Sequence, residues 1–291
     1  RDYLINLLLL PLSIPSVLLI RLLKPLYHIR FRYISTHEFG HFVDDSSIIL
    51  AERCINNHKV KDWFYIQNKP SNKFFVKIIK RKFYIRWWVK YLYLANNLIP
   101  GGKNFTKGNP RELHGSRDIN LTLHKTRKNE EAYFNFTEEE NKLGRIFLDK
   151  FGFKKEDKFV CLVVRDSSYK KKFFPNHDWS YHDYRNSDID TYSKACKELV
   201  KRGYWVFRMG SIVDKKFSCT NERVIDYPFI ENKNDFLDIW LMANCTFCIT
   251  TSSGLDCVSF AFRKPMLVLN LLPLADIMSY TNCVTYFKTL R

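Results

Sequence analysis

The second half of the chain alternates short apolar segments with amphipathic ones, and this alternation restricts the fold more than any other feature. Residues 159–165 ("FVCLVVR") are typical of a buried strand, 187–203 of an amphipathic helix, and 204–210 ("YWVFRMG") of the next strand. Buried strands separated by helices form a parallel sheet covered on both faces. We therefore predict a Rossmann-type α/β domain over residues 151–291.

Polar residues follow each predicted strand of this domain, where a sheet of this kind binds its ligands. The turn Thr250-Thr251-Ser252-Ser253-Gly254 leads into a predicted helix, whose free backbone N–H groups and dipole favour a phosphate. Arg165 can hold the same phosphate with two hydrogen bonds. In the alternative, Ser252 and Ser253 only cap the helix. The candidate phosphate-binding residues are Arg165, Asp166, Arg208, Gly210, Ser252, Ser253 and Gly254.

Two motifs that would indicate other phosphate chemistry are missing from the sequence. There is no G-x-G-x-x-G and no G-x-x-x-x-G-K-[ST], which disfavours nicotinamide cofactors and P-loop chemistry. Most of the eight cysteines stand inside apolar segments. We interpret them, including Cys245-x-x-Cys248, as reduced core residues and not as a metal or redox site.

Length and charge limit the function further. A chain of 291 residues is long enough for two domains, and a hydrophobic fraction of 46% excludes a disordered chain. The formal net charge of +17 predicts attraction to anions, which include phosphorylated small molecules, nucleic acid and anionic lipid. The chain begins with Arg1 and stops at Arg291 inside an apparent element, so we expect a fragment of a longer protein.

The N-terminal segment 1–28 is expected to associate with a membrane. Residues 4–20 carry no charge, and a basic stretch follows them. Seventeen residues barely span a bilayer, and Pro11 and Pro15 interrupt the helix. A kinked anchor and an interfacial segment both remain open, with the basic flank on the cytoplasmic side. A helix buried in the protein is the alternative.

Residues 29–150 are expected to form an N-terminal domain with a basic, aromatic helix at 71–97. Its Lys and Arg residues lie close to one helical face, which suits an anionic membrane surface with Trp87 and Trp88 at headgroup depth. An ordinary solvated face explains the pattern equally well, and no nucleic-acid recognition fold accompanies it. A long loop is predicted at 100–133, followed by a helix at 137–152 with a capping box of Thr137 and Glu140.

The motif His37-Glu38-Phe39-Gly40-His41 matches the spelling of a zinc peptidase site. Such a site needs both histidines on one helix. Here a strand is predicted to end at residues 35–36, and the cluster 44–47 ("DDSS") is predicted to cap a helix that begins after the motif. His37 and His41 would then lie on a loop, and no third ligand stands at metzincin spacing. A zinc peptidase remains the alternative function.

The segment "TTSSGLDCVSFAFRKPMLVLN" resembles the diphosphate-binding element of GT-B glycosyltransferases and sugar-nucleotide 2-epimerases. The segments "VVRDSSY", "HDYRNSDIDTYSKACKELVKRGYWVFRMGS" and "DFLDIWLMANCTFCITTSSGL" resemble more specifically a bacterial glycosyltransferase family associated with surface polysaccharide synthesis. The resemblance covers residues 159–275 and extends weakly to "EFGHFVDDSSIILAE". It implies an α/β, GT-B-like fold with two Rossmann-type domains and a cleft between them, preceded by the apolar segment.

The resemblance also implies a reaction. A nucleoside diphosphate sugar would bind the C-terminal domain, with Arg165 and the 252–254 turn stabilising the leaving group. His41 would take the proton of the acceptor hydroxyl, while His37 and Glu38 depart from the family pattern. Tyr184, Arg185 and Asn186 would reach donor or acceptor.

The resemblance also implies the partners and the location of the protein. The acceptor would be a glycan or a lipid-linked molecule at the cytoplasmic face of the inner membrane. No metal, no other cofactor and no nucleic acid are expected. A non-catalytic sugar-nucleotide-binding membrane protein and a sugar-nucleotide epimerase remain alternatives.

Overall fold

The computed structural model describes residues 2–55, 60–67, 69–110, 132–277 and 282–289. The chain divides into two compact units, Arg1–Lys128 and Asn129–Arg291. Each contains its own parallel sheet. The α/β class predicted for the chain is therefore confirmed.

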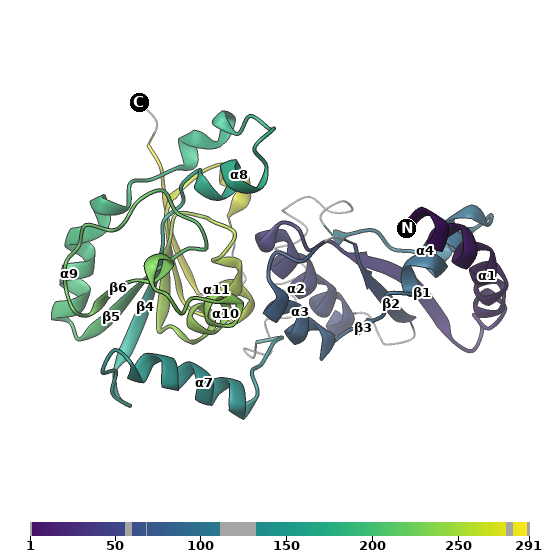
Figure 1. Ribbon diagram of the computed structural model, residues 1–291, viewed down its shortest axis with the longest axis horizontal. Helices are drawn as coiled ribbons and strands as arrows, with labels where there is room; N and C mark the ends of the chain where they lie inside the picture. Colours follow the sequence, from purple (N-terminus) through teal and green to yellow (C-terminus); the bar gives the residue numbers. More distant parts are fainter. Residues whose placement is uncertain (1, 56–59, 68, 111–131, 278–281, 290–291) are drawn as a thin grey trace. The chain divides into compact units, whose positions relative to one another are not determined.

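The first unit has a three-stranded parallel sheet in the order β1-β2-β3. Its helices lie on both sides, with α2 and α3 on one side and α1 and α4 on the other (Figure 1). On the second side, Phe31 and Tyr65 of the strands pack against Val89 and Leu92. The elements are α1 (Asp2–Leu22), β1 (His28–Ile34), α2 (Phe39–Ile55), β2 (Val60–Ile66), α3 (Lys73–Lys80), β3 (Tyr84–Ile85), α4 (Val89–Leu98) and the 3-10 helix η1 (Gly102–Phe105).

The prediction of a single helix at 71–97 is wrong. The segment forms two helices, α3 and α4, with β3 between them. Asn72 caps α3 by accepting a hydrogen bond from the Phe75 backbone N–H at 2.7 Å. Phe83 and Ile85 are buried and the chain pairs with β2, so tertiary packing breaks the basic stripe.

Helix α2 begins earlier than predicted, at Phe39. The residues interpreted as a cap, Asp44 to Ser47, are buried inside the helix. Ser46 and Ser47 donate hydrogen bonds to the carbonyls of Phe42 and Val43, four residues back, at 2.7 and 2.9 Å. A serine hydroxyl that bonds within its own helix is tolerated in the helix interior. His41 therefore lies in the first turn of α2.

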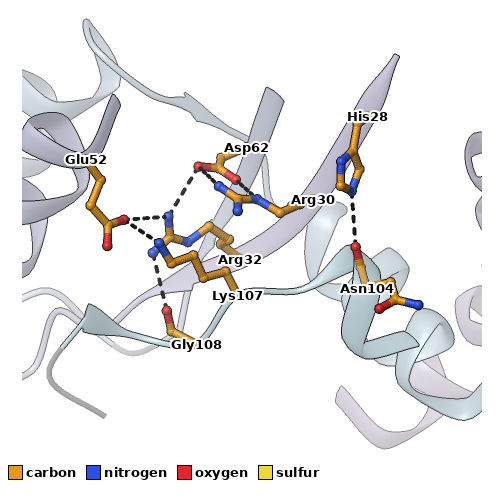
Figure 2. A network of polar contacts seen from close by, with 8 residues as sticks. All are labelled: His28, Arg30, Arg32, Glu52, Asp62, Asn104, Lys107 and Gly108. Carbon is orange, nitrogen blue, oxygen red and sulfur yellow. Dashed lines mark hydrogen bonds and ion pairs between the residues drawn. The ribbon is translucent and has the colours of Figure 1, made fainter. Parts of the chain in front are cut away.

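The face of the sheet that α2 covers holds a buried ionic network (Figure 2). Arg32 is 1% exposed, and its guanidinium lies 3.2 Å from Asp62 and 3.7 Å from Glu52. Arg30 also contacts Asp62, at 2.8 Å, and Lys107 contacts Glu52 at 2.9 Å. Burial opposes ionisation of Asp62, but the hydrogen bonds and charges of the two arginines lower its pKa overall. The network ties β1, β2, α2 and the segment after η1 together.

We expect Asp62→Ala to destabilise the protein by about 3 kcal/mol, because it leaves Arg32 buried without its main partner. Urea unfolding measures this. Glu198→Ala, which removes an exposed partner of Arg202, is the control and should change stability by less than about 1 kcal/mol. In the folded protein the pKa of Asp62 lies below its ordinary value of 3.8. The ionised carboxylate therefore stabilises the fold fully at pH values above 3.8. The difference between the proteins should shrink as the pH falls through the lowered value. Equal stability at neutral pH would contradict the role of the network.

The second unit has a six-stranded parallel sheet in the order β6-β5-β4-β7-β8-β9. Helix α9 covers one face, and α7, α10 and α11 cover the other (Figure 1). The strands are β4 (Lys158–Val163), β5 (Tyr204–Met209), β6 (Val224–Asp226), β7 (Phe247–Thr250), β8 (Met266–Leu271) and β9 (Cys283–Phe287). The helices are α7 (Glu138–Asp149), α8 (Ser168–Phe173), α9 (Ser193–Lys201), α10 (Asp235–Asn244) and α11 (Cys257–Ala261). The 3-10 turns are η2 (Ser180–Arg185), η3 (Ile189–Tyr192), η4 (Tyr227–Phe229) and η5 (Leu274–Asp276).

Local details of this unit confirm part of the sequence analysis. The capping box of Thr137 and Glu140 is present at the start of α7. Cys245 and Cys248 are buried in the core and free. The helix expected at 187–203 is shorter, because η3 comes first and α9 begins only at Ser193. Gly144 of α7 packs against the Trp240 ring so closely that a Cβ there would overlap it.

The apolar N-terminal segment forms α1, which packs on α4 within the first unit. In the part of the chain that the structure describes, no helix combines the length and apolar character needed to cross a membrane.

Candidate functional site

The candidate site lies at the carboxyl edge of the sheet in the second unit, where β4 and β7 end side by side. The backbone N–H of Thr251 donates to the Val163 carbonyl at 3.0 Å. In return, the Thr251 hydroxyl accepts a hydrogen bond from the backbone N–H of Arg165 at 2.8 Å. These bonds join the two strand ends, so Arg165 is fixed beside the 250–254 turn, as the predicted topology requires.

The turn is held by its own side chains. The Thr250 hydroxyl donates to Asp256 at 2.6 Å and accepts from the Ser252 backbone N–H at 3.1 Å, while the Ser253 N–H donates to Asp256 at 2.9 Å. Ser252 has a left-handed backbone, with φ of 61°. The N–H groups of Ser252 and Ser253, predicted to be free for a phosphate, are thus bonded within the turn. The helix that follows, α11, has only five residues, so its dipole contributes little.

Arg165, His182 and Arg185 form a cluster of basic side chains beside this turn. Arg185 donates to the carbonyl and the hydroxyl of Ser252, each at 3.4 Å. Burial lowers the pKa of Arg165, and the neighbouring charge of Arg185 lowers it further. Burial also lowers the pKa of His182, as do the charges of Arg165 and Arg185. The lowered pKa favours the neutral imidazole of His182, so the positive potential that favours an anion comes from the guanidinium groups of Arg165 and Arg185.

The cluster offers unused donors. Buried nitrogens of Arg165 (Nε), Arg185 (Nε) and His182 (Nδ1) have no hydrogen-bond partner among the described residues. A buried polar group of this kind needs an explanation, because it has lost its hydration without compensation. A bound anion would supply the missing acceptors.

A small pocket opens at the same edge of the sheet. Its volume is about 270 Å³, including its open mouth. Asp276, on its rim, lies 3.7 Å from Arg185. The lining residues come from the β7–α11 turn, α11, β8, η5 and β9, and they are Ser252, Asp256, Phe260, Val268, Leu271, Asp276 and Thr285. Its mixed polar and apolar lining is typical of a site for a small polar ligand.

An aromatic segment runs from α8 to η2 beside the basic cluster. The Lys170 ammonium lies over the Trp179 ring, 4.2 Å from its centroid. The Trp179 and His182 rings stack with an interplanar angle of 14°, and Tyr181 is 57% exposed. Exposed rings next to cations can stack on a flat or sugar-like ligand while the cations hold its charge.

The remaining predicted residues of the second unit have other surroundings. Arg208 is 1% exposed and pairs with Asp226 at 2.8 Å, so its charge is used inside the unit. Asp166 accepts from the backbone N–H groups of Ser168 and Asp214, each at 2.9 Å, and shapes the loop. Gly210 directly follows β5, Gly254 lies in the β7–α11 turn, and Tyr184 lies inside η2. Asn186 donates a hydrogen bond to Asp183 at 2.8 Å.

The first unit contributes a histidine paired with a carboxylate. Nδ1 of His41 lies 2.7 Å from a carboxylate oxygen of Glu38, and the His41 side chain is 46% exposed. A carboxylate at Nδ1 fixes the tautomer with hydrogen there and leaves Nε2 as the basic nitrogen. Glu38, which departs from the family pattern, was not among the predicted site residues. Its spacing of three residues at a helix start was the available signal.

The zinc peptidase geometry is not formed by these residues. His37 precedes α2, where its Nδ1 lies 3.0 Å from the Ser35 hydroxyl, while His41 is inside the helix. The two imidazoles therefore do not share a helical face. Across the described ranges, no group of three or more His, Cys, Asp or Glu side chains is arranged to hold a metal ion.

Comparison with known proteins identifies the fold. No family model matches the chain, and no curated protein matches it. The crystal structure of a glycosyl transferase family 9 protein from Veillonella parvula DSM 2008 matches with a TM-score of 0.56 and 12% identity, over 90% of this chain and 86% of that one. The E. coli ADP-heptose lipopolysaccharide heptosyltransferase II matches with a TM-score of 0.49 and 13% identity, over 88% and 90% of the two chains.

A third structure, E. coli heptosyltransferase WaaC with ADP-2-deoxy-2-fluoro heptose, matches with a TM-score of 0.45 and 10% identity, over 88% of this chain and 92% of that one. The similarity to the Veillonella structure, together with the two parallel sheets, shows that this chain has a GT-B-like fold, as the sequence resemblance predicted.

Proposed function

We propose that the protein is a glycosyltransferase that uses a nucleoside diphosphate sugar as donor. The observation that carries the proposal is the cluster of Arg165, His182 and Arg185, with its unused buried donors at the carboxyl edge of a Rossmann-type sheet. A diphosphate fits this cluster because two guanidinium groups hydrogen-bond its oxygens and neutralise its charge. The GT-B-like fold supports the same class of ligand.

The proposed reaction uses the His41–Glu38 pair of the first unit and the arginine cluster of the second unit. The acceptor hydroxyl oxygen bonds to the anomeric carbon of the sugar, and the bond from that carbon to the diphosphate oxygen breaks. Nε2 of His41 takes the hydroxyl proton, with Glu38 stabilising the imidazolium. Arg165 and Arg185 stabilise the negative charge that grows on the leaving nucleoside diphosphate. We propose that these guanidinium groups replace a metal ion, so that EDTA leaves the turnover unchanged.

The acceptor proposed is a glycan or a lipid-linked molecule of surface polysaccharide synthesis, used at the cytoplasmic face of the inner membrane. The net charge of +17 supports an acceptor carried on an anionic surface. We propose no cofactor, since the nucleoside diphosphate sugar acts as a co-substrate.

Melting temperatures measured with UDP, GDP, ADP and CMP test the donor site. A nucleotide at about a hundred times its dissociation constant adds about 2.7 kcal/mol, which for a chain of this size raises the melting temperature by roughly 5 to 10 °C. We expect such a rise with one nucleotide, also in the presence of EDTA. If no nucleotide raises the temperature while Zn²⁺ does, the transferase proposal fails in favour of the peptidase. Binding without nucleoside diphosphate release, with every acceptor supplied, would indicate the non-catalytic alternative.

A further inference from the structure

The outer face of α1 and the turn after it are covered with exposed leucines. Six side chains define this leucine face, with exposures of 70% for Leu12, 50% for Leu18, 57% for Leu19, 76% for Leu22, 39% for Leu23 and 75% for Leu26. Pro11, just before Leu12, and Pro15 and Ser16 within the segment are also exposed. Single exposed leucines are ordinary, but a contiguous apolar surface indicates an interaction site.

The opposite face of the same helix is already used by the fold. Leu10, Ile14, Val17 and Ile20 pack into the core cluster that contains α4. Arg21 fixes the end of α1 by donating to the Asn96 side chain at 2.7 Å and to the carbonyls of Asn96 and Pro100 at 2.8 and 2.7 Å. Helix α1 is therefore apolar on both faces, and its own unit covers only one of them.

The charge of the chain is concentrated in the unit that carries this face. Residues 1–128 contain 23 Lys or Arg and 8 Asp or Glu, a net charge of +15 out of +17 for the whole chain. There is no Asp or Glu at positions 3–37 or 63–111. Beside the leucine face, Lys24 lies over the Phe105 ring at 5.3 Å and Lys61 over the Tyr27 ring at 5.2 Å. An apolar face flanked by cations and free of nearby acids in the sequence is complementary to an anionic lipid surface.

We propose that the leucine face docks the first unit on an anionic membrane, with α1 lying in the plane of the interface. The leucine face belongs to the first unit and the donor cluster to the second, so docking on a membrane does not depend on the proposed transferase activity. Lipid is the occupant that fits best, because the face offers aliphatic side chains with cations at its edge and few groups for specific hydrogen bonds.

The packing of α1 decides between the two membrane arrangements that the sequence left open. A helix that crosses a bilayer would have to leave α4, exposing the core cluster around Val17 and breaking the Arg21 hydrogen bonds. An in-plane helix keeps all of these contacts and buries only the leucines. Typical interfacial helices bury their apolar face about 5 to 10 Å into the headgroup region.

Flotation of the full chain with lipid vesicles tests the docking. We expect binding to vesicles of phosphatidylcholine with phosphatidylglycerol, weaker binding to phosphatidylcholine alone, and partial release in high salt. The double variant Leu19→Glu/Leu22→Glu should bind the anionic vesicles about a hundredfold more weakly, because two buried leucines are replaced by carboxylates. Leu143→Glu, at a 56% exposed leucine of α7 in the second unit, is the matched control and should bind like the wild type.

Three outcomes would overturn the proposal. They are no binding of the wild type to anionic vesicles, equal binding of the double variant, and a dimer in solution that the double variant breaks, which would make a second copy of the chain the occupant. Unchanged melting of the double variant, with its nucleotide response intact, shows that the loss is local. For the in-plane arrangement, the added indole of Leu19→Trp should be quenched most by lipids brominated near the headgroup. Strongest quenching from bromines at the chain ends would contradict it.

Discussion

Replacing His41 with glutamine is expected to lower kcat by about 10² to 10⁴-fold, the range typical of losing a positioned general base. Glutamine keeps the size and polarity of the side chain but cannot take the acceptor proton. Because His41 is 46% exposed on the first turn of α2, the fold and the donor affinity should not change. Turnover is measured as release of nucleoside diphosphate from the donor that raises the melting temperature, with a membrane lipid extract as the source of acceptor.

Two further variants separate chemistry from structure. His37→Gln changes a neighbouring histidine that contacts Ser35 and should leave turnover unchanged, whereas a zinc site would lose its metal. Glu38→Gln removes the carboxylate that orients His41 and stabilises its imidazolium, so we expect a smaller fall in kcat than His41→Gln gives. Full activity of His41→Gln would exclude this histidine as the base.

The second unit was predictable because its signal is local. Strands such as β4 and β7 are buried on both faces, so their apolar runs are uninterrupted in the sequence. The first unit was harder, since its helices contain residues that usually end helices. Asp45 and Ser46 lie buried inside α2, and only the contacts made by the folded chain determine that. The strand β9 at the edge of the second sheet was missed, because its residues are mostly exposed or half-buried.

The site was predictable to the level of a sheet edge and no further. Parallel strands place Arg165 and Ser252 at the same edge, as the sequence indicated. The sequence did not show that the Ser252 and Ser253 N–H groups are bonded to Thr250 and Asp256, since capping a turn and holding a phosphate use the same atoms. It also did not show that His182 joins the cluster, because the long loop that carries it has no periodic pattern to place it.

Replacing Arg165 with alanine is expected to lower kcat/KM by about 10² to 10³-fold and to remove most of the nucleotide-induced rise in melting temperature. The backbone N–H of Arg165 is fixed by the Thr251 hydroxyl at the joined ends of β4 and β7, and the residue is half-buried. Charge-assisted hydrogen bonds at such a position are strong, and they strengthen as charge develops on the leaving group. Arg165→Lys should lose less, because an ammonium supplies the charge without the paired hydrogen bonds.

The melting temperature of Arg165→Ala without nucleotide distinguishes a binding role of Arg165 from a structural role. In the absence of an anion, Arg165 and Arg185 repel each other, and this repulsion contributes to the lowered pKa of Arg165. Removing one of them should therefore leave the melting temperature of the free protein unchanged or slightly raised, while the response to nucleotide disappears. Arg202→Ala, which removes a 69% exposed arginine paired with Glu198, is the control and should respond like the wild type. A structural arginine would give the opposite pattern. If Arg165→Ala melts well below the wild type yet keeps its full nucleotide response, Arg165 stabilises the fold and the anion site lies elsewhere.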